Sequence, residues 1–149
     1  MEAHCAHDMA ITLRDLYQIQ TSIGSLLSAE FDVRTSYRLR KFLRAVREEM
    51  RDAEEARMKL IRKHSSEGPL LQDTPAFLQF NAEWQEMLES TIELPEVQIT
   101  ISEMEAARVV CAEPDKSTSR RRFLAGEVAD LEFLITDDPP EPTKQRDQQ

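Results

Sequence analysis

The sequence is poor in the residues that make tight turns and disulfide frameworks. It has three glycines in 149 residues, which argues against turn-rich β folds and glycine-rich phosphate loops. Its two cysteines, Cys5 and Cys111, cannot build a disulfide framework, and a reducing compartment is the simpler interpretation. These shortages favour one helical domain over a small disulfide-rich fold.

Long apolar segments are also absent. No apolar run approaches the roughly 20 residues of a membrane span. The first eight residues lack the basic region and apolar stretch of a signal peptide. We therefore expect a cytoplasmic protein that does not contact a membrane.

Charge is abundant and unevenly divided. The net charge is -9, and 32% of the residues are charged. Residues 34–63 contain eleven Lys/Arg and five Asp/Glu, whereas residues 65–113 contain ten Asp/Glu and one basic residue, Arg108. Opposite charges on neighbouring elements favour correct pairing, although each exposed ion pair adds little stability. We expect the acidic segment to lie against the basic one.

Two long helices are predicted from the spacing of apolar residues. The first begins at a Thr12 cap and continues to about residue 29. The second covers residues 34–63 and ends before Gly68 and Pro69, which are helix stop signals.

A third helix and a strand follow. Thr74 is a cap and Pro75 occupies the first position of a helix that carries an aromatic row. Residues 92–101 alternate between apolar and polar, which predicts a strand with no partner strand in the chain. Such an edge recruits another strand, from a second copy or another protein. The candidate partner-binding residues are therefore Phe77, Phe80, Trp84, Val97, Ile99 and Ile101, although an aromatic row of this kind is more often part of a core.

The C-terminal part is predicted to be a short helix, a loop and a last helix. Ser102 and Glu105 match a capping box that opens a helix to about residue 110. Residues 113–122 are a polar loop, and residues 124–135 return to helical spacing.

The predicted fold is mainly α: a long antiparallel helical hairpin or three-helix bundle with a small C-terminal strand-plus-helix unit. We expect residues 1–8 to be a disordered leader, with Met9 as an alternative start. Residues 9–135 form a single helical domain, and residues 136–149 form a disordered tail.

Side chains with catalytic or metal-binding chemistry do not form a recognisable site. His4, Cys5, His7 and Asp8 match no closed zinc spacing. Cys111 lacks a histidine at a diagnostic spacing. We predict no catalytic, metal-ligating or cofactor-binding residues, no cofactor and no enzymatic activity.

A row of basic residues gives a candidate nucleic-acid interface. The row recurs mostly every three or four residues, so its members share one helical face that matches a phosphate backbone. Neutralisation by the acidic segment 65–113 and the shortage of aromatic residues other than Tyr37 argue against this use. The row consists of Arg34, Arg38, Lys41, Arg44, Arg47 and Arg51, and residues 120–122 form a weaker arginine cluster.

Three segments of the sequence resemble a group of small phage-encoded proteins of unknown function. They are TSYRLRKFLRAVREEMRDAEEARMKLIRKH, FNAEWQEMLESTIELPEVQITISEME and VADLEFLI. The resemblance covers about residues 12–135, with a longer insertion at 107–122 and no Ser-Pro before the last helix. It implies a helical hairpin, a phage or prophage origin and the cytoplasm of a bacterial host, and it carries no catalytic residues.

The leading functional hypothesis is a non-enzymatic accessory protein of phage origin that acts by protein–protein interaction. Its role would be in assembly, replication or the binding of a host factor, with a protein partner or self-association. The alternative is a nucleic-acid-binding accessory protein that uses the basic face of residues 34–63.

Overall fold

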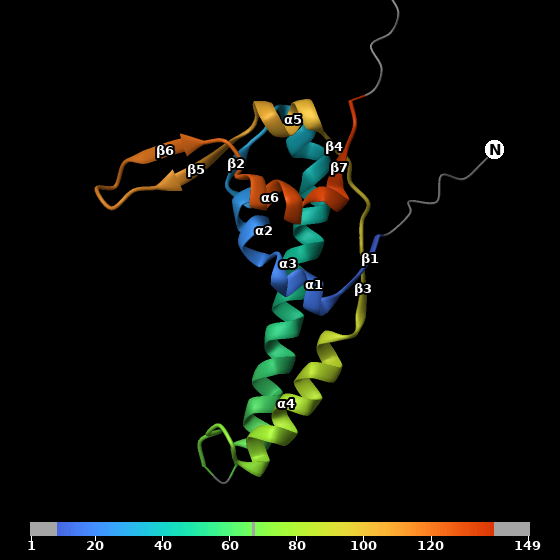
Figure 1. Cartoon of the computed structure of the whole chain (residues 1–149), viewed down its shortest axis with the longest axis vertical. Coiled ribbons are helices and arrows are strands. Elements are labelled where there is room, and N and C mark those ends of the chain that lie inside the picture. Colours follow the sequence, from blue (N-terminus) through green and yellow to red (C-terminus); the bar gives the residue numbers. More distant parts are fainter. Residues whose placement is uncertain (1–8, 67, 139–149) are drawn as a thin grey trace, which may run out of the picture.

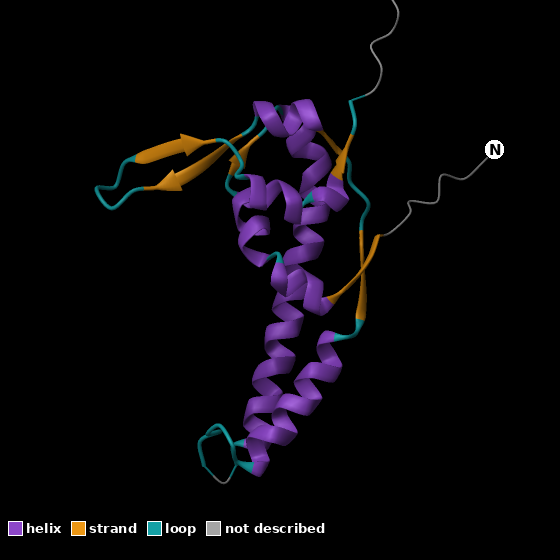
Figure 2. Cartoon of the chain, viewed as in Figure 1, coloured by secondary structure: helices purple, strands orange, loops and turns teal. Residues whose placement is uncertain are grey.

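The computed structural model describes residues 9–66 and 68–138 (Figures 1 and 2). Of these residues 58% are helical and 18% belong to strands, in six helices and three small sheets. The fold is therefore mixed α/β, and the prediction of a mainly α hairpin or three-helix bundle is wrong. Each strand has only two to five residues, and outside residues 92–101 this is too few for an alternating pattern to stand out in the sequence.

The longest element is α3 (Val33–His64), which agrees with the predicted second helix. The Asp32 carboxylate caps its start by accepting a hydrogen bond from the Thr35 amide at 2.8 Å. Its 32 residues extend about 48 Å at 1.5 Å per residue. Different elements therefore cover its two halves.

The second half of α3 is covered by α4 (Pro75–Leu88), which returns alongside it to form a hairpin (Figure 1). Thr74 Oγ1 accepts a hydrogen bond from the Phe77 amide at 3.2 Å. The predicted cap and proline start of this helix are confirmed.

The predicted helix from Thr12 to residue 29 is divided. Its place is taken by β1 (Met9–Thr12), α1 (Leu13–Gln18), α2 (Gln20–Leu27) and β2 (Ala29–Glu30). In one continuous helix, residues ten apart such as Leu13 and Ile23 would point about 80° away from each other. The break at Ile19 lets both side chains enter the same core, where both are buried.

Residues 92–101 form two strands that pair within the chain. β3 (Thr91–Leu94) is antiparallel to β1, and β4 (Ile99–Thr100) is parallel to β7 (Ile135–Thr136). Pro95 separates the two strands because it has no amide hydrogen to donate to a ladder. The prediction that this segment has no partner strand in the chain is therefore wrong. Its partners come from sequence-distant segments, one immediately before the predicted first helix and one at the end of the predicted last helix.

The helix predicted from residue 102 to 110 is shorter and begins earlier. It is α5 (Ile101–Ala106), and its capping box consists of Thr100 and Glu103 rather than Ser102 and Glu105. Val109 and Val110, assigned to this helix from the sequence, belong instead to a strand.

Residues 113–122, predicted as a loop, contain a strand. β5 (Arg108–Ala112) and β6 (Thr118–Arg121) form a hairpin that pairs with β2 and projects from the body (Figure 1). The predicted last helix is α6 (Ala125–Asp130), followed by a 3-10 turn (Glu132–Leu134). Asp138 accepts a hydrogen bond from the Ser102 amide at 3.2 Å. The start of the predicted tail thus belongs to the fold, whereas residues 1–8 and 139–149 lie outside the described part.

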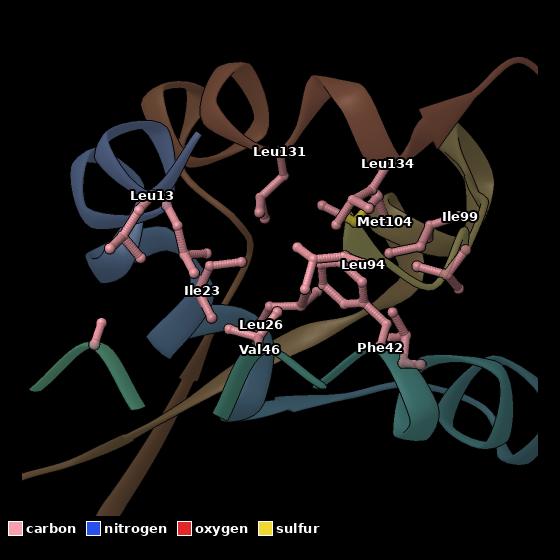
Figure 3. Close-up of a cluster of buried hydrophobic side chains, with 14 of the residues drawn as sticks. Leu13, Ile23, Leu26, Phe42, Val46, Leu94, Ile99, Met104, Leu131 and Leu134 are labelled. Carbon is pink, nitrogen blue, oxygen red and sulfur yellow. The ribbon is translucent and has the colours of Figure 1, made fainter. Parts of the chain in front are cut away.

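The core lies against one side of the first half of α3 (Figure 3). Buried apolar side chains converge there from α1, α2, β3, β4, α5 and the C-terminal turn. Those labelled in the figure are Leu13, Ile23, Leu26, Phe42, Val46, Leu94, Ile99, Met104, Leu131 and Leu134. All of these elements pack on one side of α3, so the opposite side of its first half faces solvent.

Candidate functional site

The first half of α3 has a buried face and a basic face. Thr35, Leu39, Phe42 and Val46 follow one another at steps of three or four residues and are buried. The residues on the opposite side are exposed, and most are basic. This second side, called the basic face below, consists of Arg34, Arg38, Arg40, Lys41, Arg44, Arg47 and Arg51.

The structure brings all six predicted basic residues onto this exposed side. Their positions extend about 26 Å along the helix from Arg34 to Arg51. The prediction omitted Arg40, which borders the same surface hollows as Lys41 and Arg44. The prediction selected residues three or four positions apart, starting from Arg34, and this selection omits Arg40. A helical projection of the whole segment places Arg40 close to Arg44 on the helix surface.

Acidic residues neutralise little of the basic face. Within residues 9–66 and 68–138, Arg38 is its only member in an ion pair, and its partner is Glu103 of α5. At the far end of α3, Lys63 donates to Glu83 at 2.8 Å and His64 contacts the same carboxylate. The acidic segment 65–113 thus forms ion pairs with α3 at two places, through Glu83 and Glu103, and leaves most of the basic face unpaired.

The Glu103 carboxylate is held in its charged form. Burial opposes the charge, but hydrogen bonds from Thr35, Arg38 and the Thr100 amide outweigh it and lower the pKa of Glu103 to about 2. Glu103 therefore fixes α5 to the start of α3 and holds the Arg38 guanidinium in place.

An apolar groove of about 430 Å³ runs beside the basic face. It lies where α2 and β2 meet α3, and it is open to solvent. Leu26 and Leu39 are its buried members, while Leu27 remains 39% exposed. The residues called the groove below are the apolar Leu26, Leu27, Phe31, Leu39 and Leu43, with Arg40, Arg44 and Arg47 on its border.

A second hollow lies at the start of the basic face. Tyr37 is 76% exposed and Val33 is 86% exposed, and they line it together with Arg34 and Arg38. Tyrosine and arginine are the residues that are enriched at protein interfaces, so an exposed Tyr37 between Arg34 and Arg38 is suited to one.

The predicted partner-binding residues do not form one surface. Phe80, Val97 and Ile99 are buried. Trp84 is half-buried and meets the Tyr17 ring edge-on at 5.6 Å, and Phe77 lies 6.2 Å from Phe80. Only Ile101 is exposed, at 41%. The more common role of these residues, in packing, accounts for all but Ile101.

The arginines at 120–122 are mostly engaged within the chain. Arg120 pairs with Glu30 at 3.0 Å. Arg121 Nη1 donates to Glu127 Oε1 at 2.6 Å, and Glu127 is itself buried. The hydrogen bond from Arg121 is the main reason that the pKa of Glu127 falls to about 2, and burial opposes it. Nothing in the sequence near Glu127 distinguishes it from the many exposed glutamates.

Chemistry for a metal site is missing from the described part of the chain. Residues 9–66 and 68–138 contain no group of three or more His, Cys, Asp or Glu side chains placed to hold a metal ion. Cys111 is half-buried on β5. The cluster His4, Cys5, His7 and Asp8 lies outside the described residues.

Comparisons with known proteins give no relative. No protein-family model, no curated protein and no solved structure matches the chain. Among the described helices, none has both the length and the apolar character of a membrane span.

Proposed function

We propose that this protein is a non-enzymatic accessory protein that binds another protein through the basic face of α3. The observation that carries the proposal is an exposed and largely unpaired positive face on a chain whose net charge is -9. Clustered like charges repel one another, so a fold gains nothing from leaving them unpaired. Such a face is suited to an anionic surface of a partner.

The division of charge favours a protein partner over nucleic acid. Outside residues 34–63 the chain has 23 Asp/Glu and eight Lys/Arg. A long phosphate backbone would extend past the basic face and meet this negative surface, which repels it. A protein contact confined to the face avoids that repulsion, and the exposed Tyr37 and Val33 give it apolar contacts that a phosphate backbone does not use.

Nucleic acid is the second candidate because the basic face extends about 26 Å along one helix. That length could follow several phosphates. This use would give binding that weakens steeply as salt is raised.

The resemblance to small phage-encoded proteins supports a phage origin and action in the cytoplasm of a bacterial host. The proposed roles are assembly, replication or binding of a host factor.

The test is affinity capture from bacterial lysate with and without nuclease, using the wild-type chain and the Lys41→Glu/Arg44→Glu variant. Both residues are exposed and have no ion pair to lose, whereas Arg38 is left unchanged because it holds Glu103. Arg62→Glu is the matched control, an exposed arginine of the same helix about 27 Å from Arg44.

We expect the wild-type chain and the Arg62→Glu variant to capture a partner protein from the lysate, and the Lys41→Glu/Arg44→Glu variant not to capture it. Nuclease treatment of the lysate should leave this capture unchanged. The proposal would be overturned if only nucleic acid were captured, or if the double variant captured the same protein as the wild type.

A further inference from the structure

The groove beside the basic face combines two kinds of surface on one helix. On α3, Leu39 and Leu43 form an apolar row one turn apart, and Arg40, Arg44 and Arg47 form the next row on the helix surface. Leu27 of α2 and Phe31 stand on the other side of the apolar row. A ligand in the groove would therefore meet apolar side chains below and guanidinium groups along one side.

We propose that the groove receives an acidic amphipathic helix of a partner protein. This inference rests on the proposed function and specifies the partner's chemistry. The helix buries leucine-like or aromatic anchors against Leu27, Leu39 and Leu43, and its Asp or Glu residues lie along the arginine row.

Charge complementarity selects this occupant. Arg40, Arg44 and Arg47 occupy positions i, i+4 and i+7 and have no ion-pair partner among the described residues. Acidic residues on a helix recur at the same spacing, so a helix lying along α3 can pair with all three. Three same-side residues of an extended strand span about 13.6 Å, whereas Arg40 to Arg47 spans about 10.5 Å along α3, so a strand matches the row less closely than a helix does.

The groove is large enough to hold a few anchoring side chains of a partner, but not the surface of a whole domain. Its volume of about 430 Å³ is at the lower end of the range for ligand pockets. The half-buried Leu43 and the 39% exposed Leu27 keep apolar area available. Covering that area adds affinity that a purely ionic contact lacks.

The test uses a fluorescein-labelled, designed helical peptide of about four turns with leucines on one face and glutamates beside them. A second peptide has serine in place of each leucine, and a third has glutamine in place of each glutamate. Fluorescence anisotropy at physiological salt measures binding of each peptide to the full chain.

Two protein variants test the arginine border and the apolar lining of the groove separately. Arg44→Glu/Arg47→Glu reverses the border, and Leu27→Gln removes an apolar side chain that is already partly exposed, so folding is little affected. The matched controls are Arg62→Glu on the same helix and Leu71→Gln in the loop before α4, where the leucine is 61% exposed. Circular dichroism and urea denaturation confirm that each variant is folded.

We expect the leucine–glutamate peptide to bind, with affinity at least tenfold weaker for each groove variant and unchanged for each control. The serine and glutamine peptides should each bind at least tenfold more weakly. Absence of binding by the leucine–glutamate peptide would overturn the inference.

Two further results would also overturn it. In the first, Leu27→Gln leaves binding of the leucine–glutamate peptide unchanged, and the serine peptide binds with the same affinity. The contact would then be purely ionic, and the proposed protein binding through the basic face would still hold. A concentration-dependent dimer, seen by sedimentation and abolished by Arg44→Glu/Arg47→Glu, would assign the groove to a second copy of the chain. Failure of the proposed function itself would be detected in the separate lysate experiment, as protein capture that is unchanged by Lys41→Glu/Arg44→Glu.

Discussion

Glu127 connects three separate parts of the fold. Its carboxylate accepts hydrogen bonds from Arg121 of β6 and Ser25 of α2, and from the Leu124 amide at 2.8 Å. It is 7% exposed, so its charge is stabilised by these partners rather than by water. The base of the projecting hairpin is thereby fixed to α2 and α6.

Replacing Glu127 with glutamine should lower the free energy of unfolding by about 1–3 kcal/mol, because Arg121 loses its charged partner. Urea denaturation measures the change. Glu132→Gln is the control, because this glutamate is exposed and its side chain makes no hydrogen bond in the described structure, and it should change stability little. Equal losses for the two variants would contradict this role for Glu127.

The low pKa values of Glu103 and Glu127, both about 2, make stability depend on pH. In the unfolded chain these groups have a pKa near the ordinary value of 4.5, so below it the unfolded state binds protons that the folded state does not. Their contribution is therefore fully present above about pH 4.5 and is lost as the pH falls toward 2. We expect the urea midpoint to fall between pH 6 and pH 3, and to fall less in Glu103→Gln/Glu127→Gln. The same fall in both proteins would contradict the assignment.

At the scale of elements, two small sheets connect the two ends of the described chain to residues 91–100. β1 at the N-terminal end pairs with β3, and β7 at the C-terminal end pairs with β4. β1 covers β3 with Ala10 opposite Glu93, and both of these side chains are exposed. A pair of cysteines at facing positions has the separation that a disulfide needs.

Ala10→Cys/Glu93→Cys, in a chain with Cys5 and Cys111 replaced by serine, should form an intrachain disulfide in a monomer. Non-reducing electrophoresis and mass spectrometry measure it, and Ala10→Cys/Glu96→Cys is the mismatched control. Intermolecular disulfides in place of the intrachain bond would show that β3 pairs with a second copy.

The basic face also predicts an unusual effect on stability. Arg44 has basic neighbours Arg40, Lys41 and Arg47 at helical distances of three or four, and such like-charge pairs are destabilising. Arg44→Glu should therefore leave the free energy of unfolding unchanged or raise it by roughly 0.5 kcal/mol at low salt. The gain should shrink at high salt as the charges are screened. A loss above about 1 kcal/mol would mean that Arg44 has a structural role instead.

Helices with clear signals were predictable, and so was extended structure within residues 92–101, but the other strands and all strand pairings were not. The Thr12 and Thr74 caps and the long period of α3 are local signals, and all three are present in the structure. The pairing of β1 with β3 and of β4 with β7 depends on residues about 80 and 36 positions apart, which no local pattern reports. The capping box was placed two residues late because Ser102/Glu105 and Thr100/Glu103 match the same pattern.

The candidate site was predictable in composition but not in extent. Helical spacing identified six of the seven basic residues and could not show whether acids neutralise them. The groove needs Leu27 of α2 beside Leu43 of α3, a contact set by tertiary packing. The aromatic and strand residues proposed for partner binding have the same apolar character as core residues, so sequence alone cannot separate the two uses.

At the scale of the whole molecule, packing is confined to one side of the first half of α3. The core elements gather on that side, the basic face lies on the exposed side, and the groove lies between the two, where α2 and β2 meet α3. Negative charge predominates elsewhere in the chain. The basic face thus lies on a chain whose remaining charge is mostly negative, and this contrast favours binding of an anionic partner at that face.

The most direct test is photo-cross-linking from the start of the basic face. Tyr37 is replaced by p-benzoylphenylalanine, a similar exposed aromatic residue, and Leu71 is replaced in a control. After irradiation in bacterial lysate, we expect a nuclease-resistant protein adduct from position 37 and none from position 71. Adducts from position 71 alone, an adduct removed by nuclease, or none from position 37 would contradict it.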